Sequence, residues 1–231
     1  MQHRSALTES IDGPCSYKDM QKCMRDVGNI GSITGVHWTV LRWLDRFAGS
    51  SIRPLRILDA GCGGGELLRR IERWASRRNI PVSLIGIDLN SDAICAARES
   101  TPQHSMIRWA VGDVALWTEP VDLIVSSYLA HHLDDDAVVR FLKWMEQTVC
   151  RGWLIHDLYR SRVAIAGFRA MAQISQWHPF VREDGVISIR RAFMPAEWRE
   201  YVKQAGIAPH NVRIMALWPV QICVSQEKDT V

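Results

Sequence analysis

The sequence Arg56-Ile57-Leu58-Asp59-Ala60-Gly61-Cys62-Gly63-Gly64-Gly65 places two apolar residues and an acid before a run of small residues. Ile57 and Leu58 are typical of a buried strand, and the glycines indicate a backbone that turns sharply or lets a ligand approach closely. Helix-forming residues follow directly, at positions 66 to 70. A strand, a glycine turn and a helix in this order predict a cofactor-binding loop.

The glycine spacing separates two classes of cofactor. A dinucleotide-binding loop carries a third glycine where the helix packs on the strand. In the frame set by Gly61 and Gly63, Glu66 holds that position. An acid in the first helical turn would also repel a pyrophosphate group. The loop therefore disfavours NAD.

The stretch from Ile57 to Gly65 resembles motif I of the class I S-adenosylmethionine-dependent methyltransferases. Three further matches follow in the order that this family shows: Gly86-Ile87-Asp88-Leu89, then Gly112-Asp113, then Asp122-Leu123-Ile124-Val125-Ser126-Ser127. Together the matches extend over roughly residues 55–158, and an ordered set is more specific than any single motif. The resemblance implies an enzyme that uses S-adenosylmethionine as its cofactor.

Short apolar runs alternate with helical patterns along the chain. Parallel strands are expected at 56–59, 82–88, 106–111, 121–126 and 152–158, and helices at 66–78, 91–99 and 134–150. A last helix at 195–204 and an antiparallel pair of strands at 212–218 and 220–224 would complete the sheet. We therefore predict a single α/β domain over residues 1–231. Its sheet would be doubly wound, Rossmann-like and mostly parallel, with seven strands of which the last is antiparallel.

Two segments outside the sheet are expected to cover the site. By resemblance, residues 1–50 would form an N-terminal helical lid. We expect a frayed start up to Gly13, a short helix at 17–25, a flexible glycine passage, and a helix at 36–48 whose apolar spacing includes Trp38. Residues 159–194 interrupt the alternation and are predicted to be a helical insertion that caps the substrate. Its apolar set, Met171, Ile174, Trp177 and Phe180, favours an apolar or aromatic acceptor.

The resemblance implies contacts to the methionine and sugar portions of the cofactor. Ligands of open α/β sheets bind beyond the carboxyl ends of the strands, where the matched loops would gather. Gly61, Gly63 and Gly65 would lie along this part of the cofactor, and Asp59 would reach its amino group through backbone or water.

Further contacts are implied for the ribose and the adenine. Asp88 follows the second expected strand and suits two ribose hydroxyls, although an acid at a strand end also caps helices. Leu89 would offer an apolar face to the adenine ring. Asp113 and Val114 would contact the adenine amine, although a Gly-Asp pair is also an ordinary turn. Ser126, at the end of the fourth expected strand, completes the set.

The residues after the fourth strand bear on the reaction. They lack the Asn/Asp-Pro-Pro-aromatic and Pro-Cys patterns of enzymes that methylate nucleic acid bases, which disfavours macromolecular substrates. They resemble the His-Asp-Trp-Ser-Asp stretch of plant-type phenol O-methyltransferases, and the resemblance places His131 on the general base and Asp135 on the second acid. The pKa of histidine suits proton abstraction near neutral pH. His132 and His156 are the alternative bases.

These observations favour methyl transfer from S-adenosylmethionine to a small phenol, polyketide or quinone-like acceptor of secondary metabolism, with O-transfer ahead of C-transfer. The alternatives are C- or N-methylation of a small molecule, methylation of RNA or protein, and a module that binds S-adenosylmethionine without turnover. Two arginines follow the fifth strand, Arg160 and Arg162. They would either bind an anionic substrate or be exposed to solvent without a functional role.

Composition agrees with a single globular enzyme. The chain has 231 residues, 47% hydrophobic and 23% charged, with a net charge of +3, so nucleic acid is not expected as a partner. The six cysteines lack metal-ligand spacing, and Asp134 to Asp136 suit the start of a helix, so no metal site is expected. The absence of an apolar leader or membrane span predicts a cytoplasmic protein. The oligomeric state stays open.

Overall fold

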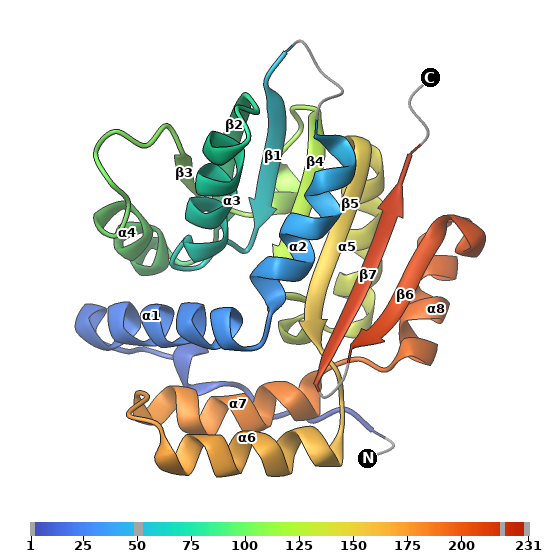
Figure 1. Cartoon of the computed structure of the whole chain (residues 1–231). Coiled ribbons are helices and arrows are strands. Elements are labelled where there is room, and N and C mark those ends of the chain that lie inside the picture. The colour runs from blue at the N-terminus through green and yellow to red at the C-terminus, as the bar shows by residue number, and fades with distance from the viewer. Residues whose placement is uncertain (1–2, 49–52, 218–219, 229–231) are drawn as a thin grey trace.

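A computed structural model describes residues 3–48, 53–217 and 220–228. Its centre is a seven-stranded sheet in the order β3-β2-β1-β4-β5-β7-β6 (Figure 1). The strands are β1 Leu55–Ala60, β2 Val82–Asp88, β3 Arg108–Val111, β4 Val121–Ser127, β5 Val149–Leu158, β6 Val212–Leu217 and β7 Gln221–Glu227. β1 to β5 pair in parallel, and β7 runs antiparallel to both β5 and β6. The predicted fold is confirmed.

Helices cover both faces of this sheet (Figure 1). They are α1 Tyr17–Ile33, α2 Val36–Leu44, α3 Glu66–Arg77, α4 Ser91–Glu99, α5 Asp135–Thr148, α6 Arg162–Ile174, α7 Pro179–Arg191 and α8 Pro195–Gln204. On one face α2 and α3 pack on β1, β4 and β5, and on the other α5 and α8 do so. Since both faces are covered, the central strands are apolar almost throughout, as the sequence indicated.

The strand order positions the site. β1 lies between β2 and β4. After β1 the chain adds β2 and β3 on one side of it, and then β4 and β5 on the other side. This reversal is the topological switch point of an open α/β sheet, where ligands bind beyond the carboxyl ends of the strands. The turns after β1, β2, β4 and β5 therefore meet at one edge.

The N-terminal segment differs from expectation in its helices. α1 continues to Ile33 through the predicted flexible passage. A Cβ atom at Gly28 would lie 3.3 Å from the Cβ of Glu66, and one at Gly31 would lie 3.1 Å from Nε2 of His37. These glycines therefore allow close packing of α1 against its neighbours, and the prediction of flexibility is wrong.

The buried face at 36–48 agrees only in part with the predicted apolar spacing, of which Leu44 and Phe47 are buried. Trp38 is 62% exposed, whereas Val36, Val40 and Trp43 are buried. The Trp38 ring instead carries the Arg42 guanidinium, 4.6 Å from its centroid. A shift of one residue rotates a helical position by about 100°, which is enough to move a side chain from the core to the surface.

The start of the chain is ordered by long-range contacts, so the expected fraying is wrong for the described residues 4 to 12. The Arg4 guanidinium lies 3.8 Å from the Phe193 ring centroid and donates to the Leu133 carbonyl at 2.7 Å. The backbone N–H groups of Ser10 and Ile11 donate to Asp184 of α7 at 2.7 and 3.0 Å. The segment therefore crosses from the α6–α7 pair to the loop after β4.

The insertion forms the α6–α7 pair, which Figure 1 shows beneath α1. The predicted apolar set within it does not converge on one surface. Ile174 is 86% exposed, and Trp177 stacks on Phe168 with centroids 5.8 Å apart. His178 ties the insertion to α1, since its N–H donates to Asp26 at 2.8 Å.

The remaining boundaries agree with expectation within a few residues. The antiparallel pair of last strands is present, although Trp218 and Pro219, which the prediction included, lie outside the described residues. Among the helices that the structure describes, none is both long and apolar enough to cross a membrane.

Candidate functional site

The glycine turn between β1 and α3 has the predicted sharp bend. Gly61, Gly63 and Gly65 all have positive φ angles, of 70°, 49° and 75°. The N–H groups of Gly61 and Cys62 both donate to the carbonyl of Ile87, at 2.9 and 3.1 Å, which fastens the turn to the end of β2. The backbone path needs residues that tolerate the left-handed region.

Two other elements close on this turn. A Cβ atom at Gly61 would lie 2.9 Å from Leu129, which follows β4, and one at Gly64 would lie 2.9 Å from the Cβ of Met24 in α1. The first helix therefore lies directly on the glycine turn, as a lid would.

Asp59, at the carboxyl end of β1, is 1% exposed. Neither of its oxygens has a hydrogen-bond partner among the described residues. Burial, with the neighbouring Asp88 charge adding to it, raises the pKa of Asp59 to about 8. An unpartnered buried carboxyl is costly, so this position is suited to a cationic or N–H-donating ligand group.

The carboxylate of Asp88 connects the turn to the next helix. Its Oδ2 accepts the Gly63 N–H at 2.8 Å, and its Oδ1 accepts the Asn90 N–H at 2.9 Å. The side chain is half-buried. Each oxygen keeps a further lone pair for a hydroxyl donor.

The other predicted cofactor residues divide by exposure. Leu89 is 74% exposed, and in the turn after β3 Asp113 is exposed and Val114 half-buried. The Asp113 carboxylate accepts the Ala115 N–H at 2.9 Å at the start of the short helical turn Val114–Leu116, which fits the ordinary turn that is the alternative role of a Gly-Asp pair. Ser126 is fully buried and donates to the Ala60 carbonyl at 2.8 Å, so its hydroxyl ties β4 to β1.

His131 is held between two carboxylates. Its Nδ1 lies 2.7 Å from Oδ1 of Asp157, and its Nε2 lies 3.5 Å from Oε1 of Glu9. Burial by itself would lower the pKa of His131, but Asp157 and Glu9 outweigh it and raise the pKa to about 10. In this setting the imidazole is already charged at neutral pH, which does not suit a general base.

His132 also lies next to the Glu9 carboxylate. Its ring lies 4.3 Å from that of His131, and its Nδ1 lies 3.2 Å from Oδ2 of Asp12. Its Nε2 lies 3.8 Å from Oε2 of Glu9. The side chain is 25% exposed, so it is the more accessible of the two adjacent histidines.

His156 lies apart from this pair. Side chains alternate along β5, so that Asp157 faces His131 on one side and His156 points to the face that α2 covers. His156 is fully buried, and neither ring nitrogen has a partner among the described residues. Burial lowers the pKa of His156 to about 4, although Asp157 opposes the shift, so the ring is neutral at pH 7.

The sequence reasoning missed four residues that shape this region: Glu9, Asp12, Asp157 and Tyr128. Tyr128 directly follows β4 and has a φ angle of 56°, which is unusual for a tyrosine. Its hydroxyl lies 3.0 Å from Oγ1 of Thr34, and burial raises its pKa to about 12. A tyrosine at a strand end was visible in the sequence, whereas Glu9 reaches the site from far along the chain.

The arginines after β5 have separate places. Arg160 is 3% exposed and donates to the Ala192 carbonyl and to Glu197, at 3.0 and 2.6 Å. Arg162 lines a cavity of about 480 Å³ with Arg4, Arg169 and Arg190. None of the predicted cofactor residues lines this cavity. Asp135, the predicted second acid, pairs with Arg4 at 2.8 Å.

Solved structures share this architecture. Human N-acetylserotonin methyltransferase in complex with S-adenosylmethionine matches with a TM-score of 0.62 and 14% identity, over 93% of this chain and 57% of that one. Magnesium protoporphyrin IX methyltransferase from Synechocystis, with bound S-adenosylhomocysteine, matches with a TM-score of 0.58 and 15% identity, over 94% and 90%. The chain therefore has the class I methyltransferase fold.

Sequence comparison identifies the central part of the chain. Residues 57–152 match the family described as a methyltransferase domain. Trans-aconitate 2-methyltransferase of Rhodopseudomonas palustris (strain BisB5) is 36% identical over 74 residues, 31% of this chain and 25% of that protein. Indolepyruvate C-methyltransferase of Streptomyces griseus is 31% identical over 123 residues, 45% of this chain and 36% of that protein. The chain spans roughly a quarter to a third of the curated relatives it matches.

Residues 57–152 thus resemble a methyltransferase domain, and the two solved structures that share the fold hold S-adenosylmethionine or S-adenosylhomocysteine.

Proposed function

We propose that this chain transfers a methyl group from S-adenosylmethionine to a small acceptor, with oxygen favoured over carbon as the methylated atom. The observation that carries the proposal is the unpartnered buried carboxyl of Asp59, which lies at the topological switch point beneath a glycine turn. When bound, S-adenosylmethionine supplies a sulfonium with an activated methyl group. The protein then contributes grip, alignment and exclusion of water.

Each part of the site has a proposed role toward the cofactor. Asp59 would pair with the amino group, and Asp88 would accept from the ribose hydroxyls with its remaining lone pairs. Gly61, Gly63 and Gly65 would let the backbone approach the ligand. Leu89, Asp113, Val114 and Ser126 are kept as proposed adenine and ribose contacts from the family resemblance. The lid, residues 1–50, and the cap, 159–194, would cover the site.

A small acceptor is supported by how the carboxyl edge is covered. Met24 of α1 lies against the glycine turn, and the α6–α7 pair is tied to α1 through His178. The likeness of residues 131–135 to phenol O-methyltransferases supports O-transfer, but the raised pKa of His131 and the ion pair of Asp135 with Arg4 do not suit the base and acid roles that this likeness implies. The relative named as an indolepyruvate C-methyltransferase favours C-transfer to a carbon acid as the second candidate. A cytoplasmic location stays a prediction.

Among the three histidines, we propose His156 as the general base in place of His131. His156 is neutral, and its ring nitrogens lack partners among the described residues. It lies near the carboxyl end of β5 beside Tyr128, whose N–H donates to the His156 carbonyl at 3.0 Å. The imidazole would take a proton from the acceptor hydroxyl as that oxygen attacks the methyl carbon in line.

The base assignment predicts a pH profile. Because the pKa of His156 is lowered to about 4, kcat at saturating cofactor should be flat between about pH 6 and 8 and fall only below about pH 5. His156→Gln should lower kcat about a hundredfold, whereas His132→Ala should change it less than about threefold. Steady-state rates across pH are the measurement. A rate that rises steadily above pH 7, or an unaffected His156→Gln, contradicts the assignment.

The reaction itself is tested with methyl-labelled S-adenosylmethionine and three panels of acceptors: phenols, carboxylic acids and 2-keto acids. Label in an ether or ester supports O-transfer, and label on carbon replaces it by the second candidate. Binding of S-adenosylhomocysteine without transfer to any panel would argue for a non-catalytic binding module. Salt-sensitive binding of RNA with transfer to it would favour the macromolecular alternative.

Cofactor affinity should depend on pH through Asp59. Only the ionised carboxylate pairs strongly with an ammonium group, and a pKa of about 8 leaves it mostly protonated at pH 6.5. Binding of S-adenosylhomocysteine should therefore be about tenfold weaker at pH 6.5 than at pH 8, with release of a proton. Calorimetry in buffers of different ionisation enthalpy measures both effects. Identical affinity and no proton release would remove Asp59 from the binding site.

A further inference from the structure

We propose that Glu9, His131 and His132 form a binding site for a divalent metal ion of the zinc class. The ligand atoms that these three side chains offer all lie within 4.8 Å of one another. Glu9 and His131 are buried and His132 is half-buried. Two imidazoles and one carboxylate are a ligand set that zinc uses in proteins.

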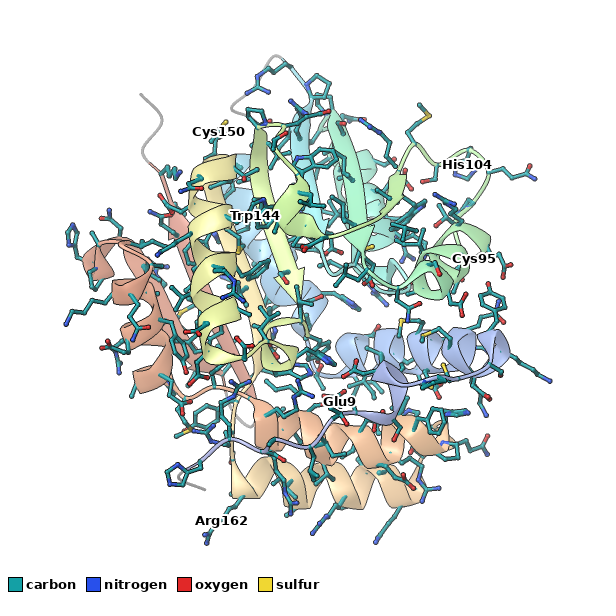
Figure 2. All side chains as sticks on the ribbon, turned by 180° about the vertical axis from the view of Figure 1, so that it is seen from behind. Glu9, Cys95, His104, Trp144, Cys150 and Arg162 are labelled. Atoms are coloured by element: carbon teal, nitrogen blue, oxygen red, sulfur yellow. The ribbon has the colours of Figure 1, made fainter. Side chains whose placement is uncertain are left out.

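The two imidazoles point the same nitrogen at one carboxylate. Nε2 of His131 lies 3.5 Å from Oε1 of Glu9, and Nε2 of His132 lies 3.8 Å from Oε2. Figure 2 shows Glu9 on the N-terminal segment, between the sheet and the α6–α7 pair. The histidines belong to the short helical turn at Ala130–His132. The site would therefore join the start of the chain to the loop after β4.

The other nitrogen of each ring faces a second carboxylate. Nδ1 of His131 lies 2.7 Å from Asp157, and Nδ1 of His132 lies 3.2 Å from Asp12. A carboxylate on the far nitrogen fixes the tautomer and ring orientation of a metal-binding histidine, and it is the usual outer partner of such ligands. Both histidines are therefore oriented with Nε2 toward Glu9.

Glu9 gives an independent sign that this cluster suits a cation. Its side chain is 5% exposed, and Oε1 has no hydrogen-bond partner among the described residues. A proton shared between an imidazole and a carboxylate would draw N and O to about 2.7–2.9 Å. Two ligands of a tetrahedral zinc ion, each about 2.0–2.2 Å from the metal, lie about 3.4 Å apart. The observed separation of 3.5 Å between Nε2 of His131 and Oε1 of Glu9 matches that of two zinc ligands.

The chemistry of the ligands selects the metal. Nitrogen donors disfavour calcium and magnesium, which take oxygen ligands. Imidazole suits zinc and neighbouring first-row ions, among which affinity generally increases toward copper. Three protein ligands leave a fourth tetrahedral position for water.

No metal was expected from the sequence, because it has no CxxC pair and no histidine at zinc-ligand spacing, and because the run from Asp134 to Asp136 suits the start of a helix. Two adjacent histidines are a weak sequence signal for a metal site, and the third ligand, Glu9, lies more than a hundred positions away along the chain. Only the path of the N-terminal segment brings these groups together.

The test uses the full chain after treatment with a chelator and removal of that chelator. Calorimetric titration with zinc chloride should show one ion per chain with a dissociation constant in the micromolar range or below. His132→Ala, which changes a partly exposed side chain, and the isosteric Glu9→Gln should each weaken binding at least about a hundredfold. Asp12→Asn should weaken it about tenfold through the outer partner. His104→Ala, an exposed histidine outside the cluster, should bind as the parent does.

Two further readouts keep the result independent of folding and of catalysis. Cobalt substitution should give the visible absorption of a tetrahedral site in the parent and in His104→Ala, and not in His132→Ala. The melting temperature should rise with zinc only in the variants that bind it. Absence of stoichiometric zinc binding, or equal affinity in His132→Ala and His104→Ala, would overturn the proposal and leave a purely proton-held cluster. Methyl transfer is not needed for any of these measurements.

Discussion

Replacing Asp59 by asparagine should stabilise the protein at pH 7 by on the order of 2–4 kcal/mol and weaken S-adenosylhomocysteine binding about a hundredfold. The carboxyl is buried without a partner among the described residues, and burial raises its pKa to about 8. Asparagine removes the cost of a buried acid, but it cannot form a charge-assisted hydrogen bond with an ammonium group.

The sign of the pH dependence follows from the raised pKa. Between about pH 4 and pH 8 the folded state keeps a proton on Asp59 that the unfolded chain releases, so stability falls as pH rises through this window. The gain from Asp59→Asn should therefore be about twice as large at pH 8 as at pH 5.5. Urea unfolding at pH 5.5 and pH 8 measures the change in stability, and calorimetry measures the affinity for S-adenosylhomocysteine.

Asp122 provides a matched control. It is 3% exposed and also lies in the sheet, but it accepts hydrogen bonds from the Arg53 guanidinium at 2.6 Å and from the Arg56 N–H at 2.8 Å. Asp122→Asn should therefore destabilise the protein, since it weakens a satisfied carboxylate. If both substitutions destabilise equally, Asp59 has a partner in solution and its proposed role in cofactor binding loses its basis.

Gly65→Ala should destabilise the protein by about 3–4 kcal/mol and abolish cofactor binding at micromolar concentrations. Gly65 has a φ angle of 75°, and a Cβ atom there would lie only 2.3 Å from Cη2 of Trp109. The substitution therefore combines backbone strain with a clash against a half-buried ring. Either the turn or Trp109 must move, and the turn is the proposed binding surface.

Two other glycines separate these contributions. Gly206 has a φ angle of 77°, and a Cβ atom there would have no heavy atom within 4 Å, whereas Gly112 is equally open without a positive φ. Gly206→Ala should cost about 1 kcal/mol from strain, and Gly112→Ala about zero. Adding Trp109→Ala to Gly65→Ala should recover affinity if the clash dominates. If Gly65→Ala and Gly206→Ala destabilise the protein equally, the Trp109 ring moves aside without cost and the clash contributes nothing. Thermal unfolding and calorimetric binding measure the series.

The sheet and the glycine turn could be predicted because their signals are local. Ile57 and Leu58 lie in a strand that is buried on both faces, so their apolar character alone indicated it. The turn at Gly61 to Gly65 was evident for the same reason, since positive φ angles select glycine. The helix from Pro195 to Gln204 was placed by the proline at its start and by Gly206 just beyond its end.

Predictions failed where a residue's role is set by its neighbours in space. Gly28 and Gly31 suggested flexibility, but they lie in α1 where Glu66 and His37 approach closely. Trp38 suggested a core position, but the side of α2 that is buried was decided by the sheet beneath it. Sequence periodicity over one short helix does not fix its rotation.

By itself, the sequence determined the alternating strands and helices of an open α/β fold, the turn after β1 and the acids at two strand ends, because each depends on neighbours along the chain. Only the tertiary structure decided the charge states of the histidines. His131 meets Asp157 and Glu9, whereas His156 meets no described partner. Electrostatic energies depend on distance and burial, which distant segments create together when they fold.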